Sequence, residues 1–218
     1  MAAVGLLFAC FGPAYAGLLL RLLYGERWGE ATEAPAALAW YCGYVLLLAL
    51  NGVTEAFVHA VADAATLARF NRALVGCSAT YLLASSALLQ YGVRGMIVAN
   101  GANMLLRIAF SARYIAAWRW EEGGGEEGGR RPRLALPAPV LAAFGTAWLV
   151  TLGAEATLYA SGACDDGLLS ARCAVRAGAH VGVGVAMLGV VGAALWRHER
   201  ALLVEVRRLW RLKRGKSE

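Results

Sequence analysis

The stretch GMIVANGANMLLRIAFSA, residues 95–112, is apolar along most of its length yet contains Arg107 beyond its middle. An arginine at membrane depth costs about 2.5–3.5 kcal/mol on insertion scales, so it normally faces other helices or a water-filled cavity. Asn100 and Asn103 precede Arg107 by seven and four residues, a spacing that places all three on one helix face. The stretch therefore predicts a membrane span whose polar stripe faces the interior of a helical bundle.

The composition supports a membrane protein. The chain has 218 residues, of which 59% are hydrophobic and 17% charged, whereas a soluble domain carries about 25% charged residues. The net charge of +6 could indicate a nucleic-acid-binding protein. However, the basic residues lie along the borders of apolar runs, and the chain has no zinc-finger or RNA-binding signature. We therefore expect membrane lipids, and no nucleic acid, among the partners.

The apolar segments predict an all-α fold. Six of them are long enough to cross a hydrocarbon core of about 30 Å as helices. We interpret the first as a span and not as a signal peptide, since no basic residue precedes it and it continues to Leu20. Residues 1–196 are thus predicted to form a transmembrane helical bundle with spans at about 2–23, 36–62, 68–91, 94–118, 137–160 and 174–196.

The distribution of lysine and arginine predicts the orientation. With six spans, 15 of the 20 basic residues other than Arg107 fall on the side that carries the C-terminal tail. Because cytosolic loops are enriched in these residues, we expect the C-terminus to be cytosolic. The tail, residues 197–218, places apolar residues among arginines, which is typical of an amphipathic helix on the anionic leaflet. A solvated basic tail that only sets the orientation is the alternative.

A second polar stripe predicts a partner for Arg107. Asn51, Glu55 and His59 are spaced four residues apart and share a helix face. At 1.5 Å per residue, Glu55 lies roughly 9 Å to the cytosolic side of the centre of its span. Arg107 lies roughly 5 Å to the same side of the centre of the apolar stretch 95–112. These two spans run in the same direction, so the two side chains can meet. Glu155, in a span of opposite direction, falls on the lumenal half.

Two interpretations of the stripes stay open. In the first, the stripes line a polar cavity for an anionic or sugar-bearing ligand, because the planar arginine fork donates to two phosphate oxygens at once. The substrate-binding residues would then be Arg107, Asn100, Asn103, Asn51 and Glu55. In the second, Glu55 and Arg107 form a buried ion pair that only locks two spans together.

We expect no enzyme and no cofactor. The chain has no HExxH zinc motif, no GxSxG elbow, no P-loop and no paired membrane aspartates. Its five cysteines have no metal-ligand spacing, although Cys164 and Cys173 flank one short loop and could pair if that loop is oxidised.

Three stretches resemble the Rft family: YCGYVLLLALNGVTEAFVHAVA (41–62), RFN (69–71) and VANGANMLLRI (98–108). The resemblance extends over most of the chain but matches only the C-terminal part of longer family members. It implies a fold similar to the two-lobed multidrug/oligosaccharidyl-lipid/polysaccharide exporters, in the endoplasmic reticulum membrane. It also implies translocation of a dolichol-linked oligosaccharide from the cytosolic to the lumenal face, in support of protein N-glycosylation. A non-transporting accessory or scaffold protein in the same pathway is the alternative.

Overall fold

The structure, a computed structural model, describes residues 1–25, 32–122, 136–159 and 170–198. It divides the chain into two compact units, Met1–Arg133 and Leu134–Glu218. Throughout the described ranges the secondary structure is helical, without strands. The predicted tail of 197–218 lies outside them from residue 199 onward, so its amphipathic helix stays a prediction.

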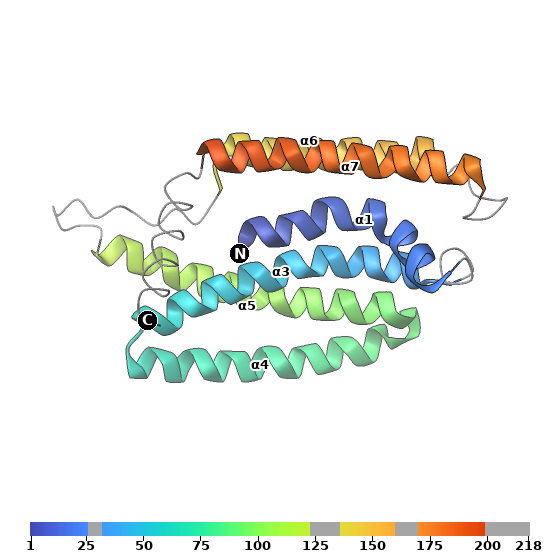
Figure 1. Cartoon of the computed structure of the whole chain (residues 1–218). Coiled ribbons are helices and arrows are strands. Elements are labelled where there is room, and N and C mark those ends of the chain that lie inside the picture. The colour runs from blue at the N-terminus through green and yellow to red at the C-terminus, as the bar shows by residue number, and fades with distance from the viewer. Residues whose placement is uncertain (26–31, 123–135, 160–169, 199–218) are drawn as a thin grey trace, which may run out of the picture. The chain divides into compact units, whose positions relative to one another are not determined.

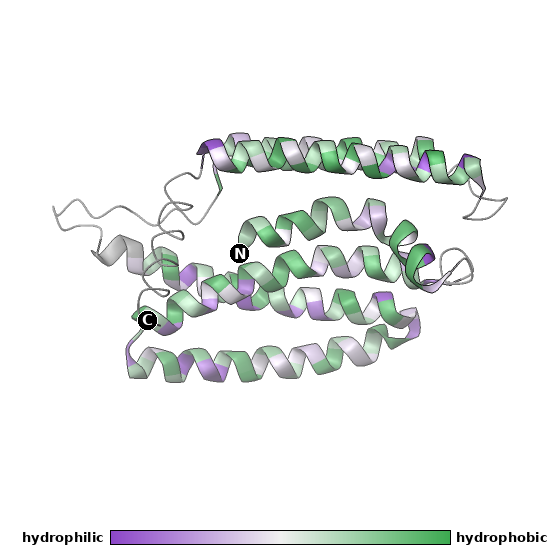
Figure 2. Cartoon of the chain, in the orientation of Figure 1, coloured by the Kyte–Doolittle hydropathy of each residue, from purple (hydrophilic) through white to green (hydrophobic). Residues whose placement is uncertain are grey.

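The first unit contains four long helices. They are α1 (Ala2–Tyr24), α3 (Ala34–Val61), α4 (Ala64–Leu88) and α5 (Gly92–Glu122). Helix α1 packs against α3, α3 against α5, and α5 against α4, so α3 and α5 are the inner helices of the unit (Figure 1). Apolar residues cover most of each ribbon, and polar residues interrupt them where α3 faces α5 (Figure 2). Arg107, on α5, thus lies on an inner helix.

The second unit is a helical hairpin. Helix α6 (Ala138–Ala154) continues into a π-helical turn, η2 (Glu155–Tyr159), and packs against α7 (Ala171–His198). The buried positions of α6 include Val140, Phe144, Ala147 and Thr151, whose spacing of three or four residues defines one helix face. That spacing is why α6 presents a continuous apolar face to α7.

The helices confirm the predicted class of all-α polytopic membrane protein. Among the described residues, five helical segments are long and apolar enough to span a membrane, and one of them, Ala64–Trp118, comprises α4 and most of α5. The chain reverses between these two helices in a 3₁₀ turn, η1 (Leu89–Tyr91), followed by Gly92 (Figure 1). Gly92 has φ 62°, a conformation that glycine adopts without steric cost. The number and bounds of the membrane spans stay a prediction.

An apolar cluster joins three helices of the first unit near the α3–α4 connection. Val58 of α3, Phe70 of α4 and Ile115 of α5 are each at most 1% exposed and pack together. Asp63 begins α4 as its N-cap, since its carboxylate accepts a hydrogen bond from the backbone N–H of Thr66 at 3.2 Å. This cluster holds α3 and α5 at the depth where their polar side chains meet.

Helices α1 and α3 approach closely at Gly12. A Cβ atom built on Gly12 would overlap Sγ of the buried Cys42 and lie 2.5 Å from its Cβ. On the same helix, Gly17 has open space around the equivalent position. Small residues allow helices to approach closely in membranes, so the absence of a side chain at Gly12 sets the α1–α3 distance.

Replacement of Gly12 by leucine is expected to destabilise the protein by about 1–3 kcal/mol, because the added side chain overfills the α1–α3 contact. The measurement is the free energy of unfolding of the purified protein in mixed micelles. Gly17→Ala is the matched control and should leave stability unchanged. Equal stability of Gly12→Leu and the wild type would show that the two helices do not pack at this distance.

Candidate functional site

Helices α3 and α5 run in the same direction and face each other with a row of polar side chains. Along α3 these residues are separated by seven and four positions, and along α5 by three and four, so each set lies on one helix face. We call this row the polar seam; its members are Tyr44, Asn51, Glu55, Asn100, Asn103 and Arg107.

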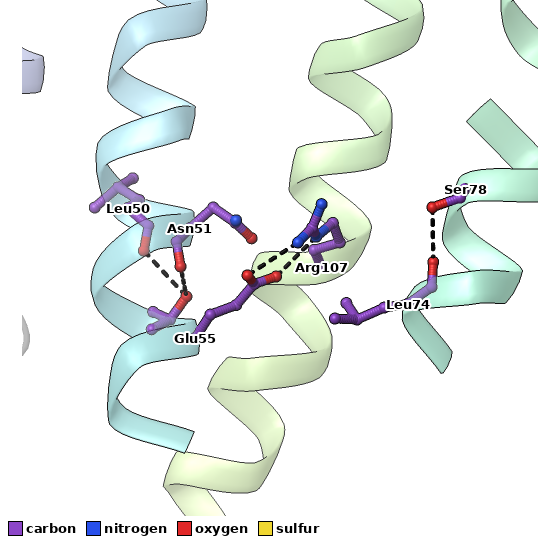
Figure 3. A network of polar contacts seen from close by, with 7 residues as sticks. Leu50, Asn51, Glu55, Leu74, Ser78 and Arg107 are labelled. Atoms are coloured by element: carbon purple, nitrogen blue, oxygen red, sulfur yellow. Dashed lines mark hydrogen bonds and ion pairs between the residues drawn. The ribbon is translucent and has the colours of Figure 1, made fainter. Parts of the chain in front are cut away.

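At one end of the seam, Glu55 and Arg107 form an ion pair with two hydrogen bonds (Figure 3). Nε of Arg107 donates to Oε1 of Glu55 at 2.7 Å, and Nη2 donates to Oε2 at 2.9 Å. The Arg107 side chain is 24% exposed and the Glu55 side chain is 16% exposed. The meeting of these residues, predicted from their depth, is confirmed. Two parallel charge-assisted bonds also fix the orientation of the guanidinium plane.

The ion pair leaves part of the guanidinium available. An arginine has five N–H donors, and the two bonds to Glu55 use one at Nε and one at Nη2. No further hydrogen bond links Arg107 to any residue that the structure describes. Three donors on the outer edge can thus contact a second anion without breaking the pair.

At the other end of the seam, Nδ2 of Asn100 donates a hydrogen bond of 2.7 Å to the hydroxyl of Tyr44. Tyr44 is 8% exposed and was not among the site residues expected from the sequence. The signal was present, because Tyr44 lies seven residues before Asn51 and so shares its helix face. A tyrosine in an apolar run is usually a packing residue, and only its partner on α5 marks it as polar.

Between these ends lie Asn51 of α3 and Asn103 of α5. They are 8% and 7% exposed, respectively. The side-chain oxygen Oδ1 of each has no hydrogen-bond partner within the described part of the chain. In Figure 3 the amide of Asn51 extends from α3 toward α5, on the same side as the ion pair. A buried, unpaired acceptor costs free energy, so this section of the seam is suited to a ligand or water molecule that donates hydrogen bonds.

Two other predicted polar residues take no part in the ion pair. His59 is exposed, and its ring centroid lies 5.7 Å from that of Phe70, so its ring contacts Phe70 rather than the ion pair. Glu155 belongs to the second unit, at the start of the π-helical turn.

The cysteines and acidic residues offer no metal site in the described ranges, where no three potential ligands lie together. Cys10, Cys42 and Cys77 are free thiols. Cys173 is disulfide-bonded, as the possible pairing of Cys164 with Cys173 requires, whereas Cys164 lies outside the described residues.

The fold and the seam together define a polytopic helical membrane protein with a charged pair between two of its spans. Residues 1–209 match the family model described as Rft protein. Because the match covers nearly the whole chain, the protein belongs to the Rft family, as the resemblance of its motifs predicted.

Three relatives share the name Man(5)GlcNAc(2)-PP-dolichol translocation protein RFT1. That of Xenopus tropicalis is 35% identical over 196 residues, which are 88% of this chain and 33% of the relative. That of Mus musculus is 32% identical over 201 residues, or 91% of this chain and 34% of the relative. That of Dictyostelium discoideum is 41% identical over 104 residues, or 47% and 19%. This chain therefore spans about a third of the length of the Xenopus and mouse relatives, and no solved structure matches it.

Proposed function

We propose that this chain takes part in moving a dolichol-diphosphate oligosaccharide from the cytosolic to the lumenal face of the endoplasmic reticulum membrane, which supports protein N-glycosylation. The names of its relatives supply the substrate class. The observation that carries the proposal is the Arg107 guanidinium, which is oriented by Glu55 and retains free donors inside an apolar bundle. The proposal assigns no catalytic step to the chain and requires no cofactor.

In this function Arg107 contacts the diphosphate. The Glu55–Arg107 pair has no net charge, which lowers the cost of holding an arginine between spans while no substrate is bound. A diphosphate carries more negative charge than one carboxylate, and its oxygens match the outer edge of the planar fork. The head group can therefore bind to a guanidinium that is already oriented, at little entropic cost.

The asparagines of the seam contact the sugars, and the dolichol chain stays in the lipid. Asn51, Asn100 and Asn103 supply amide donors and acceptors beside Arg107, whereas phosphate oxygens only accept. In the orientation that the basic residues favour, the C-terminus and the Glu55–Arg107 end of the seam lie on the cytosolic side. The tail would then rest on the anionic leaflet.

A non-transporting accessory protein of the same pathway is the second candidate. One observation favours it: Glu55 already occupies the Nε edge of Arg107 with two short hydrogen bonds, as a purely structural tie between spans would. In that case the pair only determines how α3 and α5 pack. The two candidates differ in what happens when the charge is removed but the fold is kept.

Transport is tested by reconstituting the purified protein in vesicles and following the flip of a fluorescent GlcNAc2-diphosphodolichol. We expect protein-dependent flip, reduced about ten-fold or more in Arg107→Gln, because a charge-assisted hydrogen bond contributes about 1.5–3 kcal/mol. Arg69→Gln is the control, since this exposed arginine bonds Thr66 at the start of α4, away from the seam. Flip at the rate of protein-free vesicles would exclude transport by this chain and leave the accessory role.

A further inference from the structure

The Tyr44 end of the seam has a donor and an acceptor that remain unused. The hydroxyl oxygen of Tyr44 accepts from Nδ2 of Asn100, so the hydroxyl proton and Oδ1 of Asn100 are left over. Neither has a hydrogen-bond partner among the described residues. One donor next to one acceptor is complementary to a hydroxyl group, which both accepts and donates. A phosphate oxygen would satisfy the tyrosine proton but would be repelled by the amide oxygen.

A second aromatic ring lies beside this pair. The Tyr41 ring centroid lies 5.6 Å from that of Tyr44, at an interplanar angle of 49°. Tyr41 is 48% exposed, so its ring is accessible to a ligand. Rings that offer an apolar face and a polar edge suit ligands that combine C–H faces with hydroxyls, as sugars do.

The buried amides between the two ends select for the same chemistry. The Oδ1 atoms of Asn51 and Asn103 are unpaired acceptors, and each needs a hydrogen-bond donor. Sugar hydroxyls and N-acetyl N–H groups are donors, whereas a diphosphate linked at both ends has no proton to donate at neutral pH. Asn100 and Arg107 are seven residues apart, about 10 Å along α5, so a head group can contact both ends at once.

We propose that Tyr41, Tyr44 and Asn100 form a sugar subsite, separate from the diphosphate contact at Arg107. The head group then lies along the seam with its sugars toward the Ala34 end of α3 and the Gly92 end of α5. The inference rests on the proposed function, because it assumes that Arg107 contacts the diphosphate.

The test compares two short-chain isoprenoid lipids, a GlcNAc2-diphosphate lipid and a sugar-free lipid whose diphosphate carries a methyl group in place of the sugars. Calorimetry measures the affinity of the detergent-purified protein for each. Tyr44→Phe keeps the ring and removes the hydroxyl. We expect it to lower the affinity for the glycosylated lipid about three- to ten-fold, which is the loss expected for one hydrogen bond. The affinity for the sugar-free lipid should stay within about two-fold of the wild-type value. Tyr41→Leu, which removes an exposed ring, should show the same selectivity.

Trp40→Leu is the control for a membrane-anchoring aromatic residue. Trp40 neighbours Tyr41 in the sequence and is similarly exposed, at 54%, but lies outside the subsite. It should change neither affinity. The subsite proposal would be overturned if Tyr44→Phe lowered the affinity for both lipids equally, or if the wild type showed no preference for the glycosylated lipid. If the sugar-free lipid still binds through Arg107, only the subsite is lost, whereas failure to bind either lipid removes the proposed function as well.

Discussion

Substitution of Glu55 by leucine is expected to lower the free energy of unfolding by about 3–5 kcal/mol. The reason is that Arg107 would keep its charge between α3 and α5 after losing the acceptor of both hydrogen bonds. Low exposure of both side chains prevents water from replacing the lost carboxylate effectively. Unfolding in mixed micelles, with helix content as the signal, measures the effect. Stability within 1 kcal/mol of the wild type would mean that the pair does not hold the two helices.

Two double variants separate the structural from the ligand-binding role of the pair. Glu55→Leu with Arg107→Leu removes both charges, so most of the lost stability should return, since replacing a whole buried pair by apolar residues is often neutral. Glu55→Arg with Arg107→Glu restores a pair of opposite orientation. If the charge swap restores both folding and glycolipid binding, the ion pair only links α3 to α5, and Arg107 does not contact the diphosphate. A folded variant that has lost binding supports the proposed contact.

Replacement of Phe70 by alanine is the second large effect, about 3–5 kcal/mol of destabilisation. The Phe70 ring is 1% exposed and contacts Val58 of α3 and Ile115 of α5, so its removal leaves a cavity where three helices meet. The same unfolding measurement applies. We also expect weaker glycolipid binding, because the cluster positions α3 against α5 at the level of the ion pair.

Leu83→Ala is the matched control for Phe70→Ala. Leu83 lies on the same helix, α4, but is 73% exposed, so its truncation leaves no cavity and should cost little. Equal losses for the two variants would show that helix propensity or lipid contact, and not the three-helix cluster, determines the stability of α4.

Much of the fold was predictable because a membrane imposes strong constraints on sequence. Every backbone polar group must be paired inside the hydrocarbon, so an apolar run of sufficient length has to be helical. That reasoning predicted an all-α membrane protein, and the described residues form helices from Ala2–Tyr24 to Ala171–His198. The reversal between α4 and α5 was predictable as well, since the run of 55 residues is too long for one span.

The candidate site was predictable only in part. Depth and direction sufficed to bring Glu55 and Arg107 together, because two ionised groups between membrane helices have few possible partners. Tyr44 was missed, since a tyrosine in an apolar run carries no excess polarity until Asn100 of another helix is placed beside it. His59 shares the Glu55 stripe by spacing, yet its ring lies beside that of Phe70, with the ring centroids 5.7 Å apart.

The sequence by itself determined the all-α class of membrane protein and the family to which it belongs. It also predicted which segments cross the membrane and that an arginine needs shelter between them. Only the tertiary structure decided which donors of Arg107 remain free, which amide oxygens stay unpaired, and that Gly12 allows α1 to approach α3. The physical reason is that segment choice follows from local hydrophobicity and the length of each run. Hydrogen-bond pairing and close contact instead depend on the rotation and depth of two helices relative to each other, which neither helix encodes alone.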